Sequence, residues 1–255
     1  MRPEERGELE AFRDMFAVAP EGVGAGFAMF GEALAIRLAA VPAPLLNRVM
    51  GLGGDVEDAE LDSLEEFFPA GIRYYVQVTP DARALSDRLA ERGFTPDYHW
   101  QKFARPVEPL PLRGTELRIA EVGADRGGDF AAAFVGGYGV PSGLAPWFER
   151  MPGRSGWRCF VGYAGDEPAA AGALFLSGTT GWLGLGATVP AHRGRGGQGA
   201  ILAARIAAAG AAGCTEVVTE TGVRADGRPQ ISHDNIERVG FRPTYVRENW
   251  LSPPR

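Results

Sequence analysis

A short motif that occurs twice constrains the fold of this chain more than any other feature. Gly93-Phe-Thr-Pro-Asp-Tyr98 in the first half matches Gly240-Phe-Arg-Pro-Thr-Tyr245 in the second, and Phe103 and Trp250 follow at the same spacing. Each copy follows a segment with helical periodicity, and each of those segments follows an apolar run rich in β-formers. Gly-Phe also ends many unrelated helices, but the shared context indicates two related strand–helix–strand halves.

A proline-rich stretch is the expected boundary between the halves. Three prolines fall within 104–114, which has no usable period, and prolines at this spacing favour an extended connector. We therefore predict a first domain over 1–106, a linker over 107–114 and a second domain over 115–255.

The second half alternates strand and helix patterns in a way typical of an α/β protein with a mixed α+β sheet. Its front part reads as antiparallel strands, and the back part as a helical crossover. In the first half, Thr79 and Pro80 are a plausible start for a helix over 81–92. In the second half we expect strands over 116–122, 157–164, 169–177, 181–189, 215–221 and 241–250, and helices over 125–138, 143–151, 197–212 and 229–239.

Composition excludes several classes of function. The formal net charge of the 255 residues is −6, and no basic stripe of the kind that binds nucleic acid is present. No apolar run approaches the roughly 20 residues that cross a bilayer, and the first residues lack the apolar core of a signal peptide. Two cysteines supply neither a disulfide framework nor a zinc cluster. We expect a cytoplasmic protein without a metal, a nucleic-acid partner or a membrane partner.

The segment 184–202 carries the chemistry. A strand ends near Val189-Pro190, a turn rich in Gly and Arg follows, and a helix then begins. Glycines let the backbone approach a ligand closely, and free N–H groups at a helix start favour a phosphate. Arg193 and Arg195 would add positive charge for the same anion.

Three other kinds of loop share part of this pattern. A Walker A loop requires lysine, which the loop lacks. A dinucleotide-binding fingerprint matches the glycine spacing, and Glu216 lies near the distance of its acidic residue, but that motif belongs early in a parallel sheet. A solvated glycine-rich turn is the plain alternative.

The loop resembles the pyrophosphate loop of the GNAT superfamily of N-acetyltransferases. Arg193-Gly-Arg-Gly196 matches that loop, whereas Gln198 replaces its last small residue and Gly199-Ala200 follows one place later. The resemblance extends over roughly 115–255, through Gly240-Phe241. It implies a GNAT-like fold in tandem and transfer of acetyl from acetyl-CoA, as co-substrate, to a primary amine of a small molecule or peptide. Carried over, the residues that bind acetyl-CoA are Ala187, Thr188, Val189, Arg193, Arg195, Gly196, Gly197, Gln198, Gly199 and Ala200.

The last predicted helix departs from the family pattern. Ile236 stands where many members have a tyrosine acid, and Pro229 stands where some have an asparagine. Ser232 matches a serine of one branch, and Ser232 and Asn235 share one helix face, so both are candidates to contact the cofactor or to be solvent-facing caps. These departures keep a non-catalytic acyl-CoA-binding or sensor protein as the alternative function.

The group that removes the amine proton is not evident. The strand 181–188 contains no acid, so Glu220 on the next strand is the first candidate base, acting through water. His233 is the second candidate, and solvent is the third. A paired structural carboxylate and a surface histidine are the plain interpretations of these two residues.

The first half lacks the loop altogether. Residues 55–66 hold seven acids and no Lys or Arg, and these would repel a pyrophosphate. We therefore expect a degenerate GNAT-like copy that serves architecture or shapes a site for a cationic acceptor. The protein would be a monomer with an internal pseudo-dimer, or a homodimer.

Overall fold

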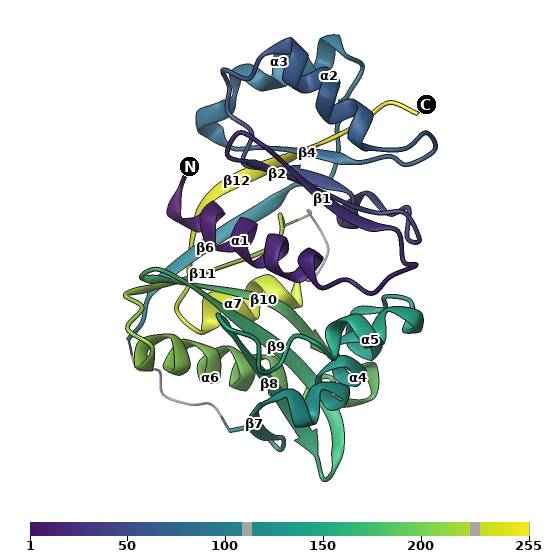
Figure 1. Ribbon diagram of the computed structural model, residues 1–255. Coiled ribbons are helices and arrows are strands. Elements are labelled where there is room, and N and C mark those ends of the chain that lie inside the picture. Colours follow the sequence, from purple (N-terminus) through teal and green to yellow (C-terminus); the bar gives the residue numbers. More distant parts are fainter. Residues whose placement is uncertain (109–113, 225–229, 255) are drawn as a thin grey trace. The chain divides into compact units, whose positions relative to one another are not determined.

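The structure is a computed structural model that describes residues 1–108, 114–224 and 230–254 (Figure 1). The chain divides into two compact units. Unit 1 comprises Met1–Lys102, Thr221–Val223 and Thr244–Arg255, and unit 2 comprises Phe103–Glu220 and Arg224–Pro243. Unit 1 therefore includes the C-terminal end of the chain, and each unit is described below by itself.

The strands of unit 2 form a mostly antiparallel sheet. In spatial order they are β11 (Glu216–Gly222), β10 (Thr180–Thr188), β9 (Glu167–Ser177), β8 (Trp157–Ala164) and β7 (Arg118–Val122). Neighbours pair antiparallel except β10 and β11, which are parallel because a helical crossover joins them.

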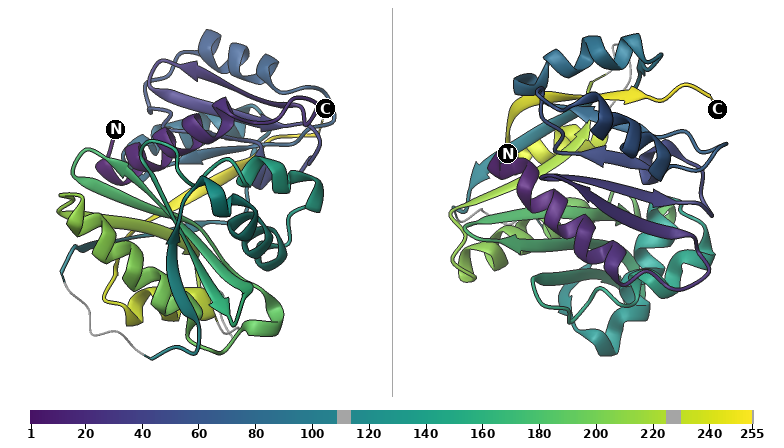
Figure 2. Two further views of the ribbon diagram at one scale, coloured as in Figure 1. Left: turned by 60° about the horizontal axis from the view of Figure 1, so that its bottom comes forward. Right: turned by 45° about the horizontal axis from the view of Figure 1, so that its top comes forward.

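Helices cover both faces of this sheet. Figures 1 and 2 show α6 (Gly197–Ala211) and α7 (Ile231–Arg238) on one face, and α4 (Gly127–Tyr138) and α5 (Ala145–Phe148) on the other. The small and aliphatic side chains of α6 pack with the sheet in one buried cluster that includes Leu183, Ile201 and Val217. Gly139, with φ of +83°, ends α4 in the left-handed conformation that glycine favours.

The expected elements of unit 2 agree with the observed ones to within about two residues, except for one helix. Only Ala145–Phe148 of the helix expected over 143–151 is α-helical, after a 3-10 turn over Ser142–Leu144. Pro146 stands in its first turn, a position that proline favours, so the α-helix begins at Ala145 instead of at 143. The predicted start at Pro229 and most of the linker, 109–113, lie outside the described residues.

The strands of unit 1 lie in the order β1 (Ala25–Phe30), β2 (Ala33–Leu38), β3 (Arg48–Met50), β4 (Tyr75–Val78) and β12 (Arg242–Leu251). β3 and β4 pair parallel, and the other neighbours pair antiparallel. Its helices and remaining strands are α1 (Pro3–Ala17), α2 (Asp58–Phe67), α3 (Ala84–Glu91), β5 (Thr95–Pro96) and β6 (Trp100–Pro106), whose last residues belong to unit 2.

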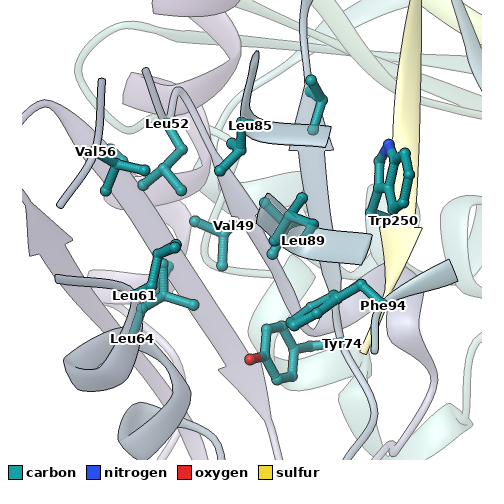
Figure 3. Close-up of a cluster of buried hydrophobic side chains, with 14 of the residues drawn as sticks. Val49, Leu52, Val56, Leu61, Leu64, Tyr74, Leu85, Leu89, Phe94 and Trp250 are labelled. Atoms are coloured by element: carbon teal, nitrogen blue, oxygen red, sulfur yellow. The ribbon is translucent and has the colours of Figure 1, made fainter. Parts of the chain in front are cut away.

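The core of unit 1 contains an aromatic residue from the far end of the chain. Figure 3 shows Trp250 of β12 beside Leu85, Leu89 and Phe94, all of which belong to one buried cluster. Phe103, which answers Trp250 in the sequence repeat, lies in the buried cluster of unit 2 instead. Trp250, from the second half of the chain, thus packs in the core of unit 1. Phe103, from the first half, packs in the core of unit 2.

This division differs from the expected boundaries. The expected second domain, 115–255, gives up 244–255 to unit 1, and the expected first domain, 1–106, gives up 103–106 to unit 2. Both halves nevertheless run through strands, a helix, a parallel strand, a helix and a final strand in the same order. The repeat therefore predicts the order of the elements along the chain. The two compact units are set instead by which strands pair, since β12 pairs with β4 of the first half.

A network of buried charges lies beneath α1 in unit 1. Glu8 accepts hydrogen bonds from Arg247, Lys102 and Arg48, with the shortest contacts at 2.7 Å to Lys102 Nζ and to Arg247 Nη1. Glu5 accepts another from Arg247 at 2.6 Å. The side chains of all five residues are at most 4% exposed, so three cations and two carboxylates form a network with one excess positive charge.

Within the described ranges, no helix combines the length and apolar character needed to cross a bilayer.

Candidate acyl-CoA site

A bulge interrupts strand β10 near its C-terminal end. Gly184 pairs with Ala173 of β9 and Ala187 pairs with Ala171, so two residues of β10 stand against one of β9. Leu185, within the bulge, has a φ of +50°, which is uncommon for a residue other than glycine. Bulges of this kind redirect a strand and often lie beside functional sites.

Strand β10 also separates from its parallel neighbour. The register records three paired positions, ending at Trp182 with Val218, although both strands continue. Where the ladder ends, the Thr219 hydroxyl donates a hydrogen bond of 2.8 Å to the Leu183 carbonyl. The strand ends therefore diverge beyond this point, and backbone groups of β10 are left without a partner residue on β11.

The loop after β10 leads to an uncapped helix start. A short 3-10 turn over Pro190–His192 is followed by Gly194 and Gly196 at φ of +81° and +77°, conformations that glycine adopts without strain. Gly196 is the N-cap of α6 and supplies no side-chain cap, so the N–H groups of the first turn have no intrahelical acceptor. A Cβ on Gly199 would meet nothing within 4 Å, which leaves room for a ligand.

The two arginines of the loop have different surroundings. Arg193 donates hydrogen bonds to the carbonyls of Thr188, at 3.2 Å, and Gly137, at 3.3 Å, and so ties the loop to α4. The side chain of Arg195 is exposed, and in the described part of the chain it makes no hydrogen bond or ion pair. Arg195 is therefore the loop cation that is available to an anion.

Gln198, the departure from the family loop, contacts α7. Asn235 Nδ2 donates a hydrogen bond of 2.7 Å to Gln198 Oε1, which links the start of α6 to the middle of α7. Ser232 is exposed, and Ile236 is buried in the core of unit 2. Of the predicted pair on this helix face, Asn235 thus lies beside the loop helix.

Glu220 lies on the diverging part of β11. It is two residues beyond Val218, the last residue of β11 paired with β10, and is half-buried. Because side chains alternate along a strand, Glu220 shares the face of Val218, opposite Val217 and the cluster under α6. The carboxylate is therefore placed where the two strands separate.

His233 has a structural environment. Its ring is buried and packs edge-on against Phe103, with centroids 4.9 Å apart. His233, Asp234 and Glu237 bring potential metal-ligand atoms within 4.8 Å of one another, a grouping that the sequence did not suggest. Arg224 pairs with Asp234 at 2.6 Å and Glu237 at 2.9 Å, so both carboxylates already have a cationic partner.

Sequence reasoning missed Arg205. It is the single charged residue in the helical stretch 197–212, which is a signal that the sequence does contain. Its Nη1 donates to the carbonyls of Ala173, at 2.9 Å, and Gly184, at 3.0 Å, the pair at which the bulge begins.

The corresponding place in unit 1 has the opposite charge. The loop between β3 and α2 borders a cavity of about 580 Å³ whose lining includes Asp55, Glu57 and Glu60. These carboxylates are consistent with the expectation that the first half does not hold a pyrophosphate.

Comparison with known proteins gives the fold. No protein-family model matches the chain, and a search of curated proteins finds no match. Among solved structures, a GCN5-related N-acetyltransferase from Kribbella flavida is similar with a TM-score of 0.68 and 17% identity, covering 99% of this chain and 96% of that one. Another, from Sphaerobacter thermophilus, has a TM-score of 0.67 and 14% identity, covering 96% and 85%. An acetyltransferase of the GNAT family from Colwellia psychrerythraea has a TM-score of 0.56 and 14% identity, covering 96% of each.

These likenesses extend over nearly the whole chain, both units included. The predicted mixed α/β fold is confirmed: the protein has the fold of the GCN5-related N-acetyltransferases. The tandem arrangement of two GNAT-like domains stays a prediction.

Proposed function

We propose that this protein is an acetyl-CoA-dependent N-acetyltransferase whose site lies in unit 2. The observation that carries the proposal is the uncapped start of α6, which directly follows a bulged strand that diverges from its parallel neighbour. This arrangement combines an anion-binding end with an opening between strands, as a long ligand with a pyrophosphate requires. The shared fold supports the same assignment.

The residues divide into those that bind and those that would assist the reaction. We expect the N–H groups of Gly197, Gln198 and Gly199, at the uncapped start of α6, to donate to pyrophosphate oxygens, and Arg195 to add a charge-assisted contact. Acetyl-CoA supplies the activated acyl group as a thioester. The remaining predicted contacts, from Ala187, Thr188, Val189 and Ala200, belong to the same strand end and helix start.

Acetyl transfer needs a neutral amine. Its nitrogen attacks the thioester carbonyl carbon, the carbon–sulfur bond breaks, the amine loses a proton and the CoA thiolate gains one. Glu220 is the favoured proton acceptor because it lies where β10 and β11 separate. The acceptor class remains a primary amine of a small molecule or peptide.

A second candidate function is a non-catalytic acyl-CoA-binding or sensor protein. Two observations favour it: β10 carries no acid, and Ile236, at the position of the family tyrosine, is buried. Such a protein would bind acetyl-CoA without releasing CoA in the presence of any amine.

Two measurements made in parallel test the proposal. Calorimetry with CoA measures binding, and free-thiol release from acetyl-CoA over a panel of primary amines measures transfer. Arg195→Ala is expected to weaken CoA binding by about 1.5–3 kcal/mol, the range for hydrogen bonds to charged groups. Arg242→Ala is the matched control, since Arg242 is also an exposed arginine of unit 2. Binding without thiol release would favour the sensor, and no binding by the wild type would contradict both functions.

A further inference from the structure

Arg205 is a buried cation that meets only uncharged groups. It is 3% exposed, and its guanidinium donates to the main-chain carbonyls of Ala173 and Gly184 and, at 3.4 Å, to Ile201 in its own helix. Within the described ranges no carboxylate lies at ion-pair distance from it. Burial lowers its pKa to about 9, which still leaves it charged at neutral pH.

The neighbouring ionisable group does not compensate this charge. Cys159 of β8 is the residue whose charge would act on Arg205, but burial raises the pKa of the Cys159 thiol and keeps it neutral. Burying a charge without a counter-ion costs desolvation free energy, which suggests that the charge has a function. The hydrogen bonds to the main-chain carbonyls offset part of this cost.

The guanidinium lies directly behind the bulge. The register gives Leu185 and Gly186 no partner residue on β9, and the recorded pairing with β11 ends earlier, at Trp182. Gly186 is exposed, yet a Cβ built on it would lie 3.7 Å from Arg205 Nη2. The backbone of the bulge therefore lies between the buried guanidinium of Arg205 and the solvent-exposed side of Gly186.

Room for the guanidinium is provided by β9. A Cβ on Gly172, the single residue opposite the bulge, would come within 2.9 Å of Arg205 Cζ. Because Gly172 has no side chain, the guanidinium fits behind the bulge. The hydrogen bonds to the carbonyls of Ala173 and Gly184 hold it there.

We propose that Arg205 is a positioning residue for acetyl transfer, a role that rests on the function proposed above. By binding the carbonyls of Gly184 and Ala173, it holds the bulge open so that main-chain N–H groups of β10 can receive the thioester oxygen. When the amine nitrogen bonds to the carbonyl carbon, that oxygen gains the electron pair and becomes negative. The positive charge behind the bulge stabilises this oxyanion until the carbonyl re-forms and the carbon–sulfur bond breaks, and the CoA thiolate then takes up a proton in exchange for the one that the amine loses.

Arg105 offers a matched control. It is also a buried arginine of unit 2, and among the residues that the structure describes it donates to main-chain carbonyls alone, those of Pro106, Glu108 and Val239. Burial lowers its pKa as well. It makes none of its hydrogen bonds to β10, so Arg105→Met reports the structural cost of losing such a residue.

The test uses the full chain and two readouts. The first is kcat and KM with acetyl-CoA and the best amine of the panel. Arg205→Met is expected to lower kcat about 100-fold, because it removes both the positive charge behind the oxyanion and the two bonds that hold the bulge, with KM for acetyl-CoA within about 3-fold. Arg205→Lys, which keeps the charge but lacks the fork that reaches two carbonyls, should lower kcat less. Arg105→Met should leave kcat within about 3-fold of wild type.

The second readout is the infrared stretch of carbon-13-labelled acetyl-CoA bound without acceptor. The thioester carbonyl should be polarised in the wild type, less so in Arg205→Lys and least in Arg205→Met. If Arg205→Met does not fold, as judged by circular dichroism, Arg205→Lys decides. Unchanged stretch and kcat in an Arg205 variant that still binds acetyl-CoA would overturn the role of Arg205 and leave the proposed function standing. A wild type that does not bind acetyl-CoA would overturn the proposed function itself.

Discussion

Replacing Glu8 with glutamine is expected to lower the free energy of unfolding by about 3–5 kcal/mol, the cost of breaking a buried ion pair from one side. Glu8 contacts Arg48, Lys102 and Arg247, and its side chain is 1% exposed. Removing its charge leaves Glu5 as the one remaining carboxylate of this five-residue network, beside three buried cations. The loss therefore comes from uncompensated charge, because glutamine nearly preserves the volume.

The same network makes stability depend on pH. Burial opposes ionisation of Glu8, but the charges of Arg247, Lys102 and Arg48 outweigh it and hold the pKa of Glu8 well below its usual range. The stabilisation is therefore present above the unfolded pKa of about 4.3 and is lost as pH falls below it. Glu8→Gln should remove this part of the acid sensitivity.

Urea unfolding followed by circular dichroism, at pH 7 and at intervals down to pH 3, measures both effects. Glu10→Gln is the control because Glu10 is a partly exposed residue of the same helix. A loss for Glu8→Gln no larger than that for Glu10→Gln would refute the reasoning, as would an unaltered slope of stability against pH.

Further predictions concern unit 2. Glu220→Gln should lower kcat by about 100-fold or more with CoA affinity intact if Glu220 is the base, whereas Glu216→Gln, on the same face of β11, should not; equal turnover of both would remove Glu220 from the reaction. If His233 is the base instead, His233→Ala should lower kcat by about 100-fold with CoA affinity intact, whereas Glu220→Gln should not. Gly137→Ala should destabilise the protein by about 1–3 kcal/mol, because its Cβ would lie 2.8 Å from the β10 backbone. Gly128→Ala, in the same helix with nothing within 4 Å, should be neutral or stabilising in the same thermal melts.

Local patterns in the sequence predicted most elements of unit 2. Strand 157–164 matches β8 at both ends, and the helix expected over 197–212 is α6 to within one residue. These elements follow from apolar periodicity and from glycines at their ends, which are properties of neighbouring residues. The loop at 193–199 was also predictable, because its glycines and arginines are adjacent in the sequence.

Properties that depend on distant residues were not predictable in this way. The bulge after Gly184 depends on the register with β9, and no spacing in 181–188 encodes it. The pairing of β12 with β4 joins residues about 170 positions apart, so a proline-rich stretch could suggest a linker but not the partners of the last strand. Arg205 is visible as a lone charge in an apolar helix, but its carbonyl partners belong to two strands.

The place of Trp250 in the core of unit 1 has a consequence for how the chain is made. Residues 1–102 leave the ribosome well before 244–251, yet their sheet and core include those later residues. Unit 1 therefore reaches its final packing only after translation has passed residue 251, although domains generally fold in the order in which they are synthesised. A nascent chain stalled before residue 244 should expose the apolar groove that Trp250 fills, and in the cell such a chain is a natural client for a chaperone.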